Sequence, residues 1–133
     1  MLNLLSSLVV ALTVVLLIFT TYKVGEYRGR HGIKAPAISG HPEFERAFRV
    51  QMNTLEASVM FLPSLWLATQ YGGAPLVAGI LGIVWLLARF WYALAYQGDA
   101  SKRGLPFTLA LMTMAGLLVW GLVGLLQHMW MVA

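Results

Sequence analysis

A small set of polar side chains interrupts an otherwise apolar sequence, and their chemical types suit the binding of a small charged ligand. The set comprises three residues at helical intervals, two tyrosines one helical turn apart and one further arginine: Arg49, Asn53, Glu56, Tyr92, Tyr96 and Arg103. It combines cationic donors, one acid and two phenols, which are the groups that bind carboxylates and an amino group. We therefore expect a site for a small zwitterionic molecule, beside apolar walls that could present a lipophilic one.

Helical geometry places several of these residues on one face of a single helix. At 100° per residue, the stripe spans only about 80° and contains Arg46, Arg49, Asn53 and Glu56. Hydrogen bonding between helices, which would set the register of a bundle, is an equally good interpretation of this stripe. Gln51 falls on roughly the opposite face. Because an amide is costly in lipid, we expect Gln51 to meet another subunit, which implies an oligomer.

The composition shows what kind of element must position these side chains. Of the 133 residues, 59% are hydrophobic, 11% are charged and none is cysteine, and the mean hydropathy is +0.76. A soluble domain has about 25% charged residues, so a water-exposed globule is excluded. Disulfides, a cysteine nucleophile and a cysteine-based metal site are excluded too. The sequence predicts one membrane domain over residues 1–133, and we expect the net charge of +4 to reflect membrane sidedness rather than nucleic-acid binding.

Four apolar stretches are long enough to cross a bilayer, which takes roughly 20 helical residues. They cover residues of about 2–22, 42–70, 75–96 and 105–131. Pro42 and Pro106 suit first helical positions, where a missing N–H has no cost. We therefore predict an all-α integral membrane protein, built as a four-transmembrane-helix bundle.

The basic residues predict the orientation of this bundle. Among the segments that connect the helices, basic residues lie in 23–41 and 97–104, whereas the turn 71–74 carries no charge. Cytoplasmic loops are enriched in lysine and arginine. Both termini are therefore expected on the non-cytoplasmic side, and the polar site is expected to face the cytoplasm.

Two further expectations concern single groups. Glu56 and Arg89 fall at the same depth, each roughly 9–10 Å inside the cytoplasmic boundary, and neither should lie there unpaired, so we expect them to approach each other. The histidines have no helical metal-ligand spacing, and no metal site is expected at His31, His41 or His128.

Two motifs resemble those of a known family. The segment 42–56, PEFERAFRVQMNTLE, is similar to the signature of the MAPEG superfamily, the membrane-associated proteins in eicosanoid and glutathione metabolism. The segment 88–92, ARFWY, followed by Tyr96 and Arg103, has the spacing of that family's third helix and next loop. The resemblance covers nearly the whole chain.

This resemblance implies a homotrimer in the lipid bilayer that binds glutathione between neighbouring subunits and acts on a lipophilic electrophile. By motif position, glutathione would contact one subunit through Arg49, Asn53, Glu56, Tyr92, Tyr96 and Arg103. It would contact the next through Gln51 and through Arg28, or Arg30 in its place. Arg103 matches the family arginine that stabilises the glutathione thiolate, so it is the expected catalytic residue. The implied activity is that of a glutathione transferase, which could also reduce lipid hydroperoxides. A non-catalytic glutathione- or lipid-binding protein, like the lipoxygenase-activating member, is the alternative.

Two departures from the family pattern narrow the expected substrate. Ala57 stands where the cysteinyl-leukotriene synthase has a tyrosine, and near Ala115 the chain lacks the tryptophan that clamps the lipid tail in that enzyme. A leukotriene-type substrate is therefore not expected. A small multidrug transporter is not expected either, because the first apolar stretch contains no acid for proton coupling.

Overall fold

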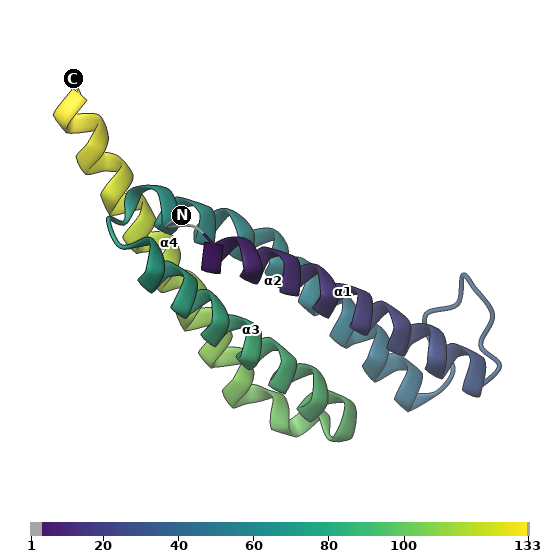
Figure 1. Cartoon of the computed structure of the whole chain (residues 1–133). Coiled ribbons are helices and arrows are strands. Elements are labelled where there is room, and N and C mark those ends of the chain that lie inside the picture. The colour runs from purple at the N-terminus through teal and green to yellow at the C-terminus, as the bar shows by residue number, and fades with distance from the viewer. Residues whose placement is uncertain (1–3, 133) are drawn as a thin grey trace.

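The computed structural model describes residues 4–132, and the regular elements in that range are all helices. The elements in order are α1 (Leu4–Arg30), α2 (Pro42–Tyr71), α3 (Pro75–Gly98), the short 3-10 helix η1 (Ala100–Arg103) and α4 (Gly104–Val132). The α1–α2 loop lies at one end of the bundle, and the final turns of α4 extend beyond the neighbouring helices at the other end (Figure 1). The first two residues of the predicted first helix, 2 and 3, lie outside the described residues.

Helix α1 is longer than the sequence predicted. It was expected to end near residue 22 but continues to Arg30, so the connecting loop is shorter than the polar segment 23–41. The additional turns are stabilised by Glu26, which accepts from Lys23 Nζ at 2.8 Å and from Arg30 Nη2 at 2.9 Å. Pairs three and four residues apart stabilise a helix because their side chains lie on the same face. The charges that suggested a loop therefore support helix here.

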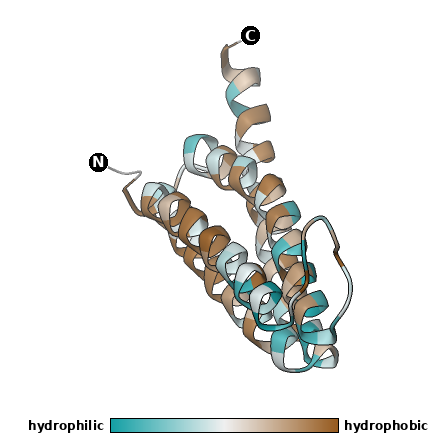
Figure 2. Ribbon diagram, turned by 90° about the vertical axis from the view of Figure 1, so that its right-hand side faces the viewer, coloured by the Kyte–Doolittle hydropathy of each residue, from teal (hydrophilic) through white to brown (hydrophobic). Residues whose placement is uncertain are grey.

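Within residues 4–132, three segments are long and apolar enough to cross a membrane: Leu4–Arg30, Pro75–Gly98 and Ala100–Val132. Helix α2 is long enough but is not among them, so the expectation that this stretch too is apolar enough to cross a membrane is not confirmed. Its charged and amide side chains lower its average hydropathy. The hydrophilic residues gather around the end of the bundle that carries the α1–α2 loop (Figure 2).

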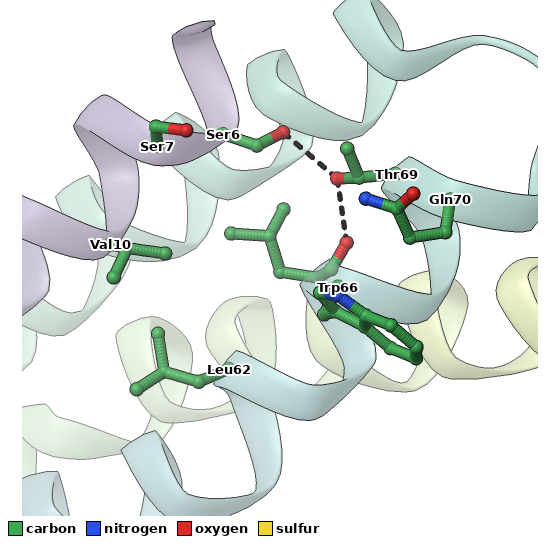
Figure 3. A pocket seen from close by; sticks show the side chains of 8 residues that line it. Ser6, Ser7, Val10, Leu62, Trp66, Thr69 and Gln70 are labelled. Carbon is green, nitrogen blue, oxygen red and sulfur yellow. Dashed lines mark hydrogen bonds between the residues drawn. The ribbon is translucent and has the colours of Figure 1, made fainter. Parts of the chain in front are cut away.

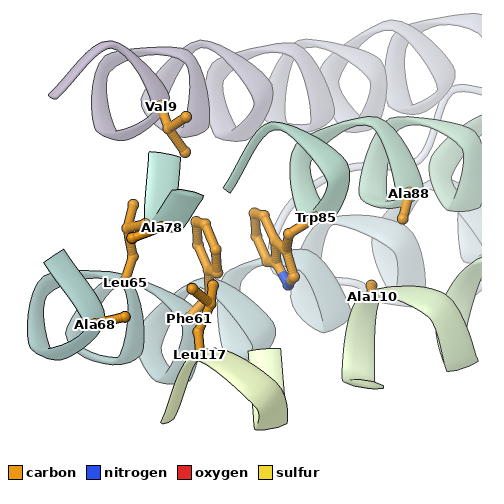
Figure 4. Close-up of a cluster of buried hydrophobic side chains, with 9 residues drawn as sticks. All are labelled: Val9, Phe61, Leu65, Ala68, Ala78, Trp85, Ala88, Ala110 and Leu117. Atoms are coloured by element: carbon orange, nitrogen blue, oxygen red, sulfur yellow. The ribbon is translucent and has the colours of Figure 1, made fainter. Parts of the chain in front are cut away.

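The core joins all four long helices at one level. Phe61 of α2 stacks on Trp85 of α3, with ring centroids 3.7 Å apart and planes inclined by 1°. Val9 from α1 and Leu117 from α4 pack around them (Figure 4), and all four side chains are essentially buried. Aromatic contacts of this kind contribute about 0.5–1.5 kcal/mol beyond the burial of apolar area. This core holds α2, α3 and α4 together next to the polar side chains.

Glycines allow α4 to approach the end of α2 closely. A Cβ atom at Gly121 would lie 2.6 Å from the backbone carbon of Leu67, and one at Gly124 would overlap the carbonyl oxygen of Tyr71. Real Cβ atoms do not approach backbone this closely, so a larger residue would separate the helices. The absence of side chains at these positions is what brings the two backbones into contact.

Hydroxyl side chains on the helices are hydrogen-bonded to the helix that carries them. Thr13, Ser58 and Thr113 each donate to a carbonyl oxygen four residues earlier, at 2.7–2.8 Å. Thr108 does the same with Gly104, at 2.9 Å. This pattern satisfies the hydroxyl donor without water, as is common for such residues in helices.

Near the end of the bundle away from the α1–α2 loop, a small cavity of about 140 Å³ lies between α1 and α2. The Ser6 and Thr69 hydroxyls are 2.9 Å apart at its edge, and Thr69 also donates to the Leu65 carbonyl (Figure 3). Trp66 and Gln70 complete its polar side. None of the residues lining the cavity is ionisable, so it offers no acid or base for catalysis. The hydrogen bond between Ser6 and Thr69 joins α1 to α2.

Candidate functional site

The principal candidate site is a cavity of about 440 Å³ between α2, α3 and the start of α4. Its walls include four of the six polar residues singled out in the sequence, namely Asn53, Glu56, Tyr92 and Arg103. The remaining walls are formed by Ala57, Met60, Gly104 and Phe107. The fold thus brings together side chains from α2, α3, η1 and α4 around one space that is polar on one side and apolar on the other.

The apolar wall was expected, but the residues that form it were not named, although helical spacing contained the signal. Met60 follows Glu56 by one helical turn on α2, and Phe107 follows Arg103 by the same interval at the start of α4. Residues four apart share a helix face, so Met60 and Phe107 continue the faces that carry Glu56 and Arg103 and make them apolar toward the membrane interior.

A hydrogen bond between α2 and α3 anchors the polar side of the cavity. Asn53 Nδ2 donates to the Tyr92 hydroxyl at 2.8 Å, and Tyr92 is only 1% exposed. The expected helical stripe therefore does place Asn53 against α3. Because the Tyr92 hydroxyl is deeply buried, removing Asn53 would leave it without a hydrogen-bond partner, and its desolvation would not be compensated.

We expect Asn53→Ala to lower the free energy of unfolding by about 1–3 kcal/mol, the cost of stranding a buried hydroxyl. Thermal unfolding in detergent without ligand would measure this loss. Tyr92→Phe removes the hydroxyl itself, so adding Asn53→Ala to Tyr92→Phe should cost much less than adding it to the wild type. Equal costs in the two backgrounds would show that the hydrogen bond contributes nothing.

Arg103 is held beside Tyr96 at the mouth of the cavity. Its Nη1 donates to the Tyr96 hydroxyl at 3.2 Å, and its guanidinium lies 5.1 Å from the Tyr96 ring centroid. Arg103 is otherwise exposed, so the guanidinium can reorient toward a molecule in the cavity. Tyr96 does not line the cavity but positions the residue that does.

The turn that presents Arg103 is ordered by local hydrogen bonds. Asp99 accepts from the backbone N–H and the hydroxyl of Ser101, at 2.9 and 2.7 Å, and so caps η1. These hydrogen bonds lower the pKa of Asp99 below its ordinary value, because they favour the ionised carboxylate. Arg46 Nε donates to the Gln97 carbonyl at 3.0 Å and ties the end of α3 to α2.

Besides Tyr96, three expected ligand contacts lie outside the cavity within this one chain. Arg49 is exposed and makes no hydrogen bond or ion pair with any residue of the described range. Gln51 projects from the other side of α2, as the helical geometry predicted, and donates to Thr21 Oγ1 of α1 at 2.9 Å. Arg28 Nη1 donates to the Ala37 carbonyl at 2.9 Å, and its guanidinium lies 4.6 Å from the Phe44 ring centroid.

The expected pairing of Glu56 with Arg89 was wrong. Arg89 is 1% exposed and donates to Thr54 Oγ1 at 2.9 Å, and its guanidinium lies 4.1 Å from the Tyr92 ring centroid. Glu56 is exposed at the cavity and makes no ion pair within residues 4–132. Both groups lie near Tyr92, but an estimate of depth along the helices does not give the direction in which each side chain points.

The loop between α1 and α2 brings together three potential metal ligands that sequence spacing did not connect. Ligand atoms of His31, His41 and Glu43 lie within 4.8 Å of one another. However, the two imidazole rings stack in parallel, 3.5 Å apart, so their in-plane lone pairs do not converge on one point. His31 Nε2 is 2.8 Å from the Glu43 carboxylate, and His41 Nδ1 accepts from the Glu43 backbone N–H at 3.2 Å. We interpret these contacts as structural: they hold the α1–α2 loop against the start of α2.

The stability of these loop contacts should depend on pH through the ionisation of Glu43. The hydrogen bond from His31 lowers the pKa of Glu43 below its ordinary value of 4.5. A carboxyl group with a lowered pKa in the folded state stabilises that state above its ordinary pKa, and this contribution is lost as the pH falls through the lowered value. We expect Glu43→Gln to speed amide hydrogen exchange in residues 31–41 at neutral pH. As the pH falls below 4.5 and through the lowered pKa of Glu43, the difference between variant and wild type should shrink and then disappear; a difference that does not shrink would show that the carboxylate is not the cause.

Together, these observations describe an all-helical membrane protein with a cavity between its helices that is lined in part by polar side chains. Residues 6–123 match the model of the MAPEG family. The chain is 42% identical over 123 residues to an uncharacterized protein of Synechocystis sp., covering 92% of this chain and 89% of that protein. The protein therefore belongs to the MAPEG family, as the two sequence motifs predicted.

Two relatives with named activities match as well. The chain is 38% identical over 105 residues to microsomal glutathione S-transferase 2 of Bos taurus, covering 79% of this chain and 71% of that enzyme. It is 34% identical over 122 residues to leukotriene C4 synthase of Cavia porcellus, covering 90% and 79%, respectively.

Proposed function

We propose that the protein is a membrane-bound glutathione transferase that ionises the thiol of glutathione and transfers it to a lipophilic electrophile. The observation that carries this proposal is the position of Arg103 on the wall of a cavity shared with Asn53, Glu56 and Tyr92. Family membership and the similarity to microsomal glutathione S-transferase 2 support glutathione as the cosubstrate.

Each polar group has a role that its charge suits. The Glu56 carboxylate would bind the amino group of glutathione, and the arginines would bind its carboxylates, since guanidinium pairs with carboxylate through two parallel hydrogen bonds. Asn53, Tyr92 and Tyr96 would add neutral hydrogen bonds. Arg49, which is exposed and unpaired within the described range, is available to a ligand at the rim.

Gln51 and Arg28 would complete the site from a neighbouring subunit of a homotrimer, because neither side chain reaches the cavity of its own chain. Arg28 holds loop carbonyls in this chain and would have to release them in order to bind glutathione. Arg30, whose guanidinium is half-exposed and paired with Glu26, is the alternative donor.

The chemistry assigned to Arg103 is the stabilisation of a thiolate. A free thiol has a pKa of about 8.5, and the thiolate is the nucleophile. Lowering that pKa by about two units takes roughly 2.7 kcal/mol of differential stabilisation, which one guanidinium near the sulfur can supply. The thiolate then attacks the electrophilic carbon, forms the C–S bond and displaces the leaving group or opens a strained ring.

Peroxidase activity would use the same thiolate. Attack on the terminal oxygen of a lipid hydroperoxide releases the lipid alkoxide, which takes up a proton and leaves as the alcohol. A second glutathione then displaces water from the sulfenic acid to give the disulfide.

A non-catalytic binding protein of the same fold is the second candidate, and it differs in needing no ionisation of the thiol.

The proposed orientation places the α1–α2 loop and η1 in the cytoplasm and both termini on the opposite side. It is supported by the basic residues at that end of the bundle, since cytoplasmic loops carry the excess of lysine and arginine. In this orientation all four long helices cross the membrane, and α2 turns its polar stripe toward the interior of the bundle.

The decisive experiment mixes the purified protein with glutathione and follows the ultraviolet absorbance of the thiolate. An enzyme of the proposed type should produce a thiolate signal at a pH where free glutathione is mostly thiol. Turnover should then be tested with a chloronitrobenzene and with a lipid hydroperoxide. Binding of glutathione without a thiolate signal, and without turnover of either substrate, would support the non-catalytic candidate.

A further inference from the structure

The turn that carries Arg103 has no buried side chain to hold it in place. Helix η1 is a single 3-10 turn, and all four of its residues are exposed. Within residues 4–132, the Arg103 guanidinium donates only to the Tyr96 hydroxyl, at 3.2 Å. A contact through the end of a long, flexible side chain does not fix the backbone from which that side chain projects. The position of this backbone must therefore depend on contacts of the turn itself.

The end of α3, in contrast, is fixed to α2 by two hydrogen bonds. Arg46 Nε donates to the Gln97 carbonyl at 3.0 Å, and Gln97 Nε2 donates to the Glu43 carbonyl at 3.1 Å. The backbone N–H of Asp99 still belongs to the helical pattern of α3, because it donates to the Ala95 carbonyl at 2.8 Å. Asp99 thus lies at the junction between a fixed helix end and an exposed turn.

The Asp99 side chain fastens this turn to the fixed helix end. Its Oδ1 accepts from the backbone N–H of Ser101 at 2.9 Å and from the Ser101 hydroxyl at 2.7 Å. The Asp99 carbonyl accepts from the backbone N–H of Lys102 at 3.0 Å. A capping carboxylate stabilises the start of a helix because it satisfies N–H groups that have no partner within the helix. Ser101 and Lys102 directly precede Arg103, so ordering them sets the direction in which the Arg103 side chain leaves the turn.

We propose that Asp99 is a positioning residue for the transferase reaction, and that by capping η1 it holds the Arg103 guanidinium at the wall of the cavity. The inference rests on the proposed function, because it gives Asp99 a part in the ionisation of glutathione that is assigned to Arg103. Arg103 lines the cavity and Asp99 does not, so Asp99 acts on a bound ligand through Arg103.

The sign of the effect separates this role from a simple effect of charge. The negative charge of Asp99, acting alone, disfavours a thiolate nearby, so its removal would lower the pKa of the glutathione thiol. A cap that keeps the guanidinium in place favours the thiolate, so its removal raises the pKa of that thiol. The two interpretations therefore predict opposite shifts for the same substitution.

The test follows the thiolate absorbance of glutathione bound at saturation to the purified protein, as a function of pH. Asp99→Ala should raise the midpoint of thiolate formation by about 0.5–1 unit and lower turnover at pH 7 about three- to tenfold, which is the range expected when one capping interaction is lost. The Kd for glutathione should change little. Asp99→Asn removes the charge but keeps a capping oxygen, so it should stay close to the wild type. Ser101→Ala removes the hydroxyl contact alone and should fall between the two.

Two comparisons separate positioning from general destabilisation. Glu45→Ala is the matched control, because it also removes an exposed carboxylate that accepts from a backbone N–H, that of Gly40 at 3.0 Å, but does so away from η1. Its midpoint of thiolate formation should equal that of the wild type. In an Arg103→Ala background, Asp99→Ala should change neither the midpoint nor the turnover further, because the effects of residues that act through one another are not additive.

Amide hydrogen exchange of residues 100–103 without glutathione checks the cap independently of activity. Exchange should be faster in Asp99→Ala than in the wild type and nearly unchanged in Asp99→Asn. Unchanged exchange in Asp99→Ala would overturn the proposal, since the carboxylate would then not order the turn.

The remaining outcomes distinguish the role of Asp99 from the proposed function. If the wild type forms the thiolate but Asp99→Ala has an unchanged or lowered midpoint, the role of Asp99 alone is overturned. The same holds if Asp99→Asn loses as much as Asp99→Ala, or if Asp99→Ala causes its full loss again in the Arg103→Ala background. A wild type that binds glutathione without forming the thiolate overturns the transferase function itself, and this proposal with it.

Discussion

Arg103→Ala is expected to lower turnover about ten- to hundredfold near neutral pH while glutathione still binds. The reason is the thiol pKa: without the guanidinium it returns toward about 8.5, so only a few per cent of bound glutathione is thiolate at pH 7. The loss should be read as a change in kcat with little change in the Kd for glutathione.

The pH profile distinguishes this role from simple misfolding. The variant's rate should rise as the pH approaches the pKa of the unassisted thiol, whereas the wild-type rate should already be level there. Lys102→Ala, at the neighbouring exposed position of η1, is the control and should keep full activity. Full activity of Arg103→Ala would remove Arg103 from the mechanism, and loss of glutathione binding in that variant would assign it a binding role instead.

Gly124→Leu is expected to destabilise the bundle by about 3 kcal/mol or more. Any Cβ at this position overlaps the backbone carbonyl of Tyr71, which no rotation of a side chain can relieve, so α4 must move away from α2. Thermal unfolding in detergent would measure the loss, and the separation of the helices should also lower the yield of folded protein.

Gly116 offers a matched control on the same helix. A Cβ there meets nothing within 4 Å, so Gly116→Ala should leave the protein unchanged or stabilise it by up to about 1 kcal/mol through better helix propensity. Destabilisation by both substitutions to the same degree would show that the contact with α2 does not determine the result.

The starts of two helices were predictable from the sequence because prolines mark them. Pro42 begins α2 and Pro75 begins α3 as expected, whereas α4 begins at Gly104, before the Pro106 that was expected to start it. The end of α1 was not predictable, because Lys23, Glu26 and Arg30 resemble a polar loop until their helical pairing is seen. Charge content alone does not distinguish a solvated helix end from a loop.

The cavity was predictable in part. Asn53, Glu56, Tyr92 and Arg103 converge as their spacing indicated, since helical periodicity gives the face of each side chain. The partner of Arg89 and the stacking of His31 on His41 were not predictable. The first depends on the rotation of two helices about their axes, and the second on the path of a loop that no periodic pattern describes. Contacts between subunits remain proposals, because the helical pattern shows only which residues face away from the chain's own cavity.

The internally satisfied hydroxyls of α4 have a consequence for membrane insertion. Thr108 and Thr113 are exposed on the outer surface of the helix, yet each already donates to a carbonyl of the preceding turn. When the helix enters hydrocarbon, these hydroxyl groups lose water but keep a hydrogen-bond acceptor within the helix. The two threonines therefore add little to the free-energy cost of moving this helix from water into the acyl chains of the bilayer.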